Sequence, residues 1–250
     1  MNIDKSKILI FSKGRQTGEL QFRYDDKSIE TVTNFNYLDI ILSRTGSFKP
    51  AMHKLAEKAT KALYEVLKRG RLHNLSIQCH LDLFDKIVQP ILLYGCEVWG
   101  FSKFAAIERI HLKFCKLLLN LKQSTPDFMI YGELGRYPME IQIKTRMITY
   151  WSKLINGKDK KYAKLLYDLG FKLQQENRGN IGWFENIKSI LNHTGLSNIW
   201  LEQTTHSTKW LKAKIKLTGT LTDQFKQNWQ STVQSSPKAL NYRMYKAELL

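Results

Sequence analysis

The sequence predicts a mainly α-helical protein with a small N-terminal antiparallel β segment, an α+β fold class. Up to Gly46, short apolar runs and alternating apolar and polar residues show the period of strands. After Gly46 the apolar residues recur about every 3.6 positions, as they do on one face of a helix. The 250 residues, 43% of them hydrophobic, can bury a sizeable core. We expect three parts: strands over residues 1–46, a helical unit over 47–125 and a second helical unit over 126–250.

Four short strands are expected in the first part. The apolar run from Lys7 to Phe11 is followed by glycines, and the segment from Leu20 to Tyr24 alternates before the polar turn that begins at Asp25. Strands over 29–33 and 37–42 complete the antiparallel set. So few strands need covering helices to be stable.

Three helices are expected in the second part. The first starts near Pro50, carries its apolar residues on one face and ends at Gly70. The second follows Asn74 or Ser76, and Pro90 should interrupt it because proline lacks a backbone donor. The third covers residues 102–121, with its apolar side chains in one stripe.

A boundary is expected at Pro126, which follows Thr125 and precedes Asp127. Beyond it the apolar period predicts helices over 139–155, 159–169, 183–193 and 218–232, the first three of them ending near glycines. The polar segment 174–180 is expected to be a loop.

Basic side chains dominate the charge of the chain. There are 39 lysines and arginines against 22 acidic residues, and the formal net charge is +17. The three parts carry +1, +7 and +9, so the excess lies after residue 46. Such an excess indicates a polyanionic partner, nucleic acid first and an anionic membrane surface second.

Other features of the composition favour a location inside the cell, in the cytoplasm or the nucleus. No apolar run approaches the length of a membrane span, and the N-terminus lacks the apolar core of a signal peptide. The cysteines Cys79, Cys96 and Cys115 are odd in number and widely spaced, which is typical of free thiols in a reducing compartment.

Two predicted helices carry rows of basic residues opposite or beside their apolar stripes. The rows consist of Lys54, Lys61 and Lys68 on the first helix and of Arg109, Lys113 and Lys116 on the third. Rows of this kind suit a phosphate backbone, which supplies most sequence-independent affinity. A solvated helix face is the alternative, favoured by the i, i+4 pairing of Glu57 with Lys61 and of Glu65 with Arg69.

Residue groups that look catalytic or metal-binding have simpler interpretations. Asp25 and Asp26 could hold Mg²⁺ only with a further carboxylate from a separate strand, so we interpret them as a polar turn. The loop Gly14–Gly18 lacks the Gly-Lys-Ser/Thr ending of a phosphate loop and is predicted to be a hairpin. Cys79 and His80, and His111 with Cys115, lack the paired spacings of structural zinc sites, and His111 is interpreted as a packed core histidine.

Several segments resemble, in order, one polymerase family. Residues Phe35 to Gly46 read FNYLDIILSRTG, and Pro90 to Trp99 read PILLYGCEVW. Further matches are NIDKSK at residues 2–7, IYGELGRYP at 130–138, FKQNW at 225–229 and YRMYK at 242–246. The ordered set resembles the region after the catalytic centre in reverse transcriptases of non-LTR (LINE-type) retrotransposons.

The resemblance implies that residues 1–46 end a polymerase palm, that 47–125 form the thumb and that 126–250 form a helical connector. The polymerase active site and its Mg²⁺ are then expected before residue 1, so that this chain is a non-catalytic fragment of an RNA-directed DNA polymerase, without a cofactor of its own. Its expected partners are an RNA or DNA primer–template duplex and the palm segment of the parent polymerase, and no membrane.

The same resemblance assigns a primer grip to Tyr37, Leu38, Asp39 and Ile40, where Asp39 replaces the family's glycine. Tyr37 and Ile40 can equally be core residues of a strand. The motif that contains Tyr94 and Trp99 is assigned mainly to packing in the thumb, with stacking on a base or sugar as the alternative.

Two other functions stay open at this point. A helical protein-interaction module would expose Trp183, Trp200 and Trp210 and use its lysines for solubility. An intact enzyme would need the palm from another chain. A steep fall of polynucleotide affinity with salt favours nucleic-acid binding, and salt-insensitive protein capture favours the interaction module.

Overall fold

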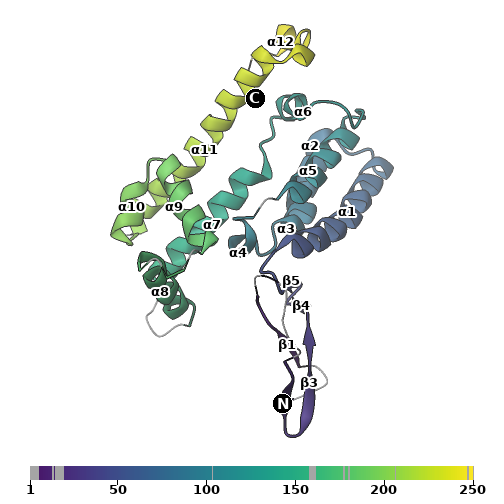
Figure 1. Ribbon diagram of the computed structural model, residues 1–250. Helices are drawn as coiled ribbons and strands as arrows, with labels where there is room; N and C mark the ends of the chain where they lie inside the picture. The colour runs from purple at the N-terminus through teal and green to yellow at the C-terminus, as the bar shows by residue number, and fades with distance from the viewer. Residues whose placement is uncertain are drawn as a thin grey trace. The chain divides into compact units, whose positions relative to one another are not determined.

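The computed structural model (Figure 1) describes residues 6–12, 14, 20–102, 104–157, 162–176, 178–179, 181–205, 207–246 and 248–249, with the backbone alone at 207–209. Residues 2–5 of the first motif, 15–18 of the predicted Gly14–Gly18 hairpin, 159–161 of a predicted helix and 177 and 180 of the polar segment lie outside this description. Among these residues, strands occur only up to Ser43 and helices make up most of the rest, which confirms the fold class.

The chain divides into two compact units, residues 1–95 and 96–250. The predicted boundaries after residues 46 and 125 fall inside these units. In the described part of the chain, no helix combines the length and the apolar character needed to cross a membrane.

The first sheet has the strand order β1–β3–β2, formed by β1 (Lys7–Leu9), β2 (Phe22–Tyr24) and β3 (Lys27–Val32). β2 and β3 pair antiparallel, but β1 and β3 pair parallel, so this sheet is mixed where an antiparallel set was expected. Because the chain reverses direction both after β1 and after β2, β3 runs in the same direction as β1. An ion pair joins Lys7 and Glu30, which lie opposite each other in this parallel pairing.

A second hairpin consists of β4 (Asn34–Tyr37) and β5 (Ile40–Ser43), paired antiparallel. The strand predicted over 37–42 is therefore wrong, because Leu38 and Asp39 form a two-residue turn in its middle. Their φ angles are +46° and +66°, the positive values that the favoured hairpin turns require. Neither Leu nor Asp is the glycine that signals such a turn, and so the apolar pattern predicted a continuous strand.

Four helical segments complete the first unit: α1 (Lys49–Leu72), α2 (Ile77–Leu83), the π-helical η2 (Phe84–Val88) and α3 (Gln89–Leu92). The first predicted helix is confirmed, and Ser76 caps α2 by accepting from the backbone N–H of Cys79 at 3.2 Å. Pro90 does not interrupt the second helix. The wider π turn just before it lets the helix continue without the hydrogen bond that proline cannot donate. Leu55, Leu63 and Phe84 lie in the core of this unit.

Helices alone build the described part of the second unit (Figure 1). They are α4 (Cys96–Trp99), α5 (Ala105–Leu118), α6 (Asp127–Leu134), α7 (Met139–Ile155), α8 (Tyr162–Gln175), α9 (Gly182–His193), α10 (Ser197–Glu202), α11 (Ser207–Ser235), the 3₁₀ helix η3 (Pro237–Ala239) and α12 (Tyr242–Tyr245). The helix predicted over 139–155 is confirmed at both ends. α8 continues past Gly170 and ends at Gln175, inside the segment predicted to be a loop. Gly170 does not end the helix. It leaves space for the Phe184 ring, which would lie 2.9 Å from a Cβ at this position.

Three of the motifs that carry the resemblance meet in one small apolar cluster of the second unit. Tyr131 and Trp229 are buried there, and the ring of Tyr131 contacts Phe225 edge to face at 5.3 Å. Trp229 Nε1 donates to the carbonyl of Phe128 at 2.7 Å. Gly132 lies so close that a Cβ would fall 2.2 Å from the hydroxyl of Tyr242. These motif residues therefore join α6 to α11 and α12, and their role here is packing.

Candidate nucleic-acid interface

The tip of the β4–β5 hairpin contacts α1 through charged side chains. Oδ1 of Asp39 lies 2.9 Å from Nζ of Lys58 and 3.5 Å from Nζ of Lys54. Lys54 also donates to Oδ1 of Asn36 at 2.9 Å. The hydrogen bond and the charge of Lys58 hold the pKa of Asp39 below its ordinary value. Two residues predicted to contact nucleic acid, Asp39 and Lys54, thus contact each other.

The other predicted primer-grip residues have different environments. Tyr37 is 59% exposed and Leu38 is 70% exposed, whereas Ile40 is half-buried. A role as a core residue of a strand therefore fits Ile40 and does not fit Tyr37. The exposed side chains at this turn form an apolar tip next to the lysines that Asp39 pairs with.

Helix α1 presents a basic outer face. It carries seven basic and two acidic residues, and its apolar face is buried from Ala51 to Gly70. Lys61 and Lys68 are exposed, and neither forms an ion pair with any residue that the structure describes. Glu65 pairs with Arg69 at 3.8 Å and leaves these two lysines uncompensated. The same face includes Lys58, which the seven-residue spacing missed but which lies one turn after Lys54.

A groove of about 800 Å³ runs along α5 in the second unit. Phe101 and Phe104 form part of its wall. Its charged lining consists of the three predicted basic residues of α5, Arg109, Lys113 and Lys116, and of two acidic residues, Glu108 and Asp127. Arg109 is exposed and Lys113 is half-buried. A concave surface with cations and aromatic rings can hold a strand of nucleic acid by charge and by stacking.

Lys116 does not lie on the exposed side of α5, where it was predicted. It is 7% exposed, and its Nζ donates to the carbonyl of Gln123 at 3.0 Å and to Oδ1 of Asp127 at 2.8 Å. The prediction is wrong because the chain folds back after α5 and covers its last turn. The Lys116 charge is already neutralised by Asp127, so Lys116 adds no net positive charge to the groove.

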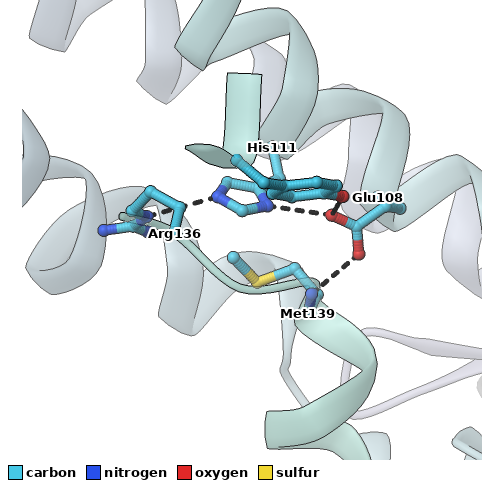
Figure 2. Close-up of polar contacts among 5 residues, drawn as sticks. Glu108, His111, Arg136 and Met139 are labelled. Atoms are coloured by element: carbon cyan, nitrogen blue, oxygen red, sulfur yellow. Dashed lines mark hydrogen bonds and ion pairs between the residues drawn. The ribbon is translucent and has the colours of Figure 1, made fainter. Parts of the chain in front are cut away.

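A polar cluster surrounds Glu108, which also lines this groove (Figure 2). Glu108 accepts hydrogen bonds from the Tyr131 hydroxyl at 2.7 Å and the Met139 N–H at 2.7 Å, and its Oε1 lies 2.9 Å from Nδ1 of His111. Nε of Arg136 donates to Nε2 of His111 at 3.4 Å. Because these partners come from α5, α6 and the start of α7, the cluster fixes α5 against both neighbours.

His111 is fully buried in this cluster, which confirms its interpretation as a packed histidine. Burial by itself lowers the pKa of His111, but hydrogen bonds and charge from Cys115 and Glu108 outweigh it and raise that pKa to about 9. The donation from Arg136 favours the neutral ring and so opposes the shift. The contact to Glu108 is the shorter of the two, and the pKa of His111 stays raised.

The residues that look catalytic form a turn. Asp25 and Asp26 connect β2 to β3, both are exposed, and their φ angles are +47° and +57°. The predicted polar turn is confirmed. A search of the described residues for three or more His, Cys, Asp or Glu side chains able to hold one metal ion finds no such group.

The tryptophans expected on the surface are mostly covered. Trp200 is buried and stacks on Trp151 at 5.8 Å, so its predicted exposure is wrong. Trp183 is half-buried and donates to the carbonyl of Glu97 at 2.8 Å. Trp99 is fully buried, which fits its assignment to packing, while Tyr94 is 45% exposed.

Comparisons of the chain with protein-family models, curated protein sequences and solved structures return no match.

Proposed function

We propose that this chain is the non-catalytic C-terminal part of an RNA-directed DNA polymerase of the LINE type. It binds a primer–template duplex along the outer face of α1, next to the β4–β5 turn. Arg109 and Lys113 of the α5 groove are proposed as a separate nucleic-acid contact of the second unit. The palm segment of the parent polymerase is its proposed protein partner. The cytoplasm or the nucleus, where primer–template duplexes occur, is its proposed location.

The exposed lysines of α1 carry this proposal. Lys61 and Lys68 lie two turns apart on one face, are exposed and have no acidic partner among the described residues. A phosphate backbone gains affinity from such cations by releasing condensed counterions. A helix face whose only purpose was solubility would be expected to interleave more acidic residues among the basic ones.

The test is the salt dependence of binding to a labelled RNA–DNA hybrid, followed by fluorescence anisotropy. Each phosphate contact contributes about 0.9 to the slope of log K against log salt. The double variant Lys61→Gln/Lys68→Gln should therefore lower the magnitude of the slope by roughly two units. Adding Lys54→Gln should change it little more, because Lys54 is already paired with Asp39.

The matched control is Lys226→Gln/Lys238→Gln, which removes the same charge from exposed positions of the second unit. If the control lowers the slope as much as the α1 variant does, the affinity comes from net charge alone and the α1 interface is wrong. An affinity for the hybrid that does not change with salt would reject phosphate contacts as the basis of binding, and no measurable affinity would reject nucleic-acid binding altogether.

One observation favours a protein-interaction module instead. Helix α8 exposes Tyr162, Leu165, Leu166 and Leu169, which fall on one helix face, at 85%, 50%, 68% and 55%. Under this second function, Leu166→Glu and Leu169→Glu would abolish an association that salt does not weaken. Hybrid binding in the same variants would be unchanged if the first proposal is right.

A further inference from the structure

A small basic pocket lies in the second unit, between α4, α7 and α11. Its volume is about 340 Å³. Three cations line it, Arg146 and Lys153 from α7 and Lys214 from α11, and the only acidic side chain of the lining is Glu97. α11 packs along α7, which brings Lys214 to the two α7 residues.

The α7 residues of the pocket share one face of the helix. Arg146, Thr149, Tyr150 and Lys153 follow the i, i+3, i+4, i+7 spacing. The Thr149 hydroxyl donates to the carbonyl of Thr145 at 2.7 Å, so it is not free to bind an anion. The Tyr150 ring is held edge to face against Trp183 at 6.4 Å, and its hydroxyl forms no hydrogen bond with the residues that the structure describes. Tyr150 is therefore a positioned donor.

The lining of this pocket contains more basic than acidic side chains. Lys153 and Lys214 form no ion pair in the described part of the chain. Arg146 hydrogen-bonds the sulfur of Cys96, which burial and the charge of Glu97 keep protonated by raising the pKa of this thiol to about 12. The neutral thiol adds no negative charge to the pocket. Three cations against one carboxylate leave a net positive pocket that attracts anions.

We propose that this pocket binds the phosphate of an unpaired nucleotide in a single strand. Arg146, Lys153 and Lys214 contact the phosphate, and Tyr150 donates a hydrogen bond to it or to the sugar. The volume is at the lower end for ligand sites, enough for one nucleotide unit and too small for a duplex. The inference extends the proposed function, on which it rests, by adding a contact to the strand that continues beyond the paired region.

The test uses the full chain and labelled oligo(dT), with anisotropy measured over a salt series. Each phosphate contact to a single strand contributes about 0.7 to the salt slope. Lys153→Gln/Lys214→Gln should therefore weaken oligo(dT) binding about tenfold at low salt and lower the slope by roughly 1.4. Affinity for a blunt RNA–DNA hybrid should stay unchanged.

The control variant Lys188→Gln/Lys226→Gln removes two exposed lysines, one on α9 and one on α11. Neither of these lysines lines the pocket. An equal loss in the control, or no loss in Lys153→Gln/Lys214→Gln, overturns the inference. So does binding of inorganic phosphate or a nucleoside monophosphate that depends on Lys153 and Lys214 while oligo(dT) binding does not, because the site would then serve a free small anion.

The two proposals fail in different ways. If hybrid binding depends on Lys61 and Lys68 while oligo(dT) binding does not depend on Lys153 and Lys214, only the proposal of a single-strand pocket is wrong. If hybrid binding is absent and oligo(dT) still depends on Lys153 and Lys214, the duplex interface is wrong and the pocket stands. Melting temperatures of the variants should match the wild type, since the two pocket lysines make no ion pairs within the described chain.

Discussion

The carboxylate of Asp39 lies 2.9 Å from the ammonium group of Lys58, and this contact ties the hairpin turn to the first helix. The polymerase family proposed for this chain has glycine at the position of Asp39. In this chain the Asp39 carboxylate forms ion pairs with Lys58 and Lys54. Without Asp39, these two lysines would face solvent or a phosphate. Under the proposed function, Asp39 competes with nucleic acid for Lys54 and Lys58 on the basic face of α1.

We expect Asp39→Gly to tighten binding to the hybrid severalfold at low salt and less at high salt, because the substitution frees both lysines and removes a repulsive charge that salt screens. The melting temperature should not fall, since φ is +66° at this position and glycine adopts such values without strain. Anisotropy and a thermal melt measure the two effects.

Asp25→Gly is the matched control for this change. Asp25 also sits in a two-residue turn at positive φ and is exposed, but it contacts no lysine of α1. Equal tightening in both variants would mean that net charge acts and that the Asp39 contact does not.

His111 predicts a pH dependence of stability. Its pKa is raised from 6.5 to about 9 in the folded chain, so the protonated form stabilises the fold. This contribution is fully present below pH 6.5 and is lost as pH rises toward about 9. The melting temperature should fall by several degrees over that interval, since about 1 kcal/mol corresponds to roughly 2–4 °C in a chain of this size.

The comparison for this experiment is His111→Gln, which cannot titrate. Its melting temperature should vary much less between pH 6.5 and 9. A wild-type curve as flat as that of the variant would show that Arg136 keeps the ring neutral. Measurements should stay below pH 9, where thiol ionisation in the unfolded chain begins to add a slope of the same sign.

Gly132 predicts a steric effect on stability. A Cβ there would lie 2.2 Å from the hydroxyl of Tyr242 and 2.9 Å from the Trp229 ring. Gly132→Ala should destabilise the second unit by about 1–3 kcal/mol, a common cost of overpacking, and it should change the fluorescence of Trp229. Gly219→Ala is the control, because nothing lies within 4 Å of its Cβ position. On α11 this control should gain about 0.5–1 kcal/mol from helix propensity. A loss in both variants would argue against the contact.

We expect no template-dependent DNA synthesis by the purified chain on a primed RNA with Mg²⁺ or Mn²⁺. Two-metal catalysis needs carboxylates from separate strands, whereas Asp25 and Asp26 lie in the same turn. Primer extension that disappears in Asp25→Ala would overturn this expectation and return the turn to the list of catalytic candidates.

Local signals predicted much of the fold. The apolar period placed α1, α7 and α9 to within two or three residues, because a helix face repeats in sequence whatever it packs against. Ser76 marked the start of α2 by its capping hydroxyl. The polar residues Asp25 and Asp26 marked a turn for the same reason, since turn conformation depends on the residues in it.

The sequence by itself therefore determined the fold class, the excess of positive charge and the positions of the main helices. The tertiary structure decided which charges are available. It buried Lys116 against Asp127, paired Asp39 with Lys54 and Lys58, and brought Lys214 to Arg146 and Lys153. Periodicity reports the face on which a residue lies, whereas an ion pair or a pocket depends on segments that are distant in the chain and meet only on folding.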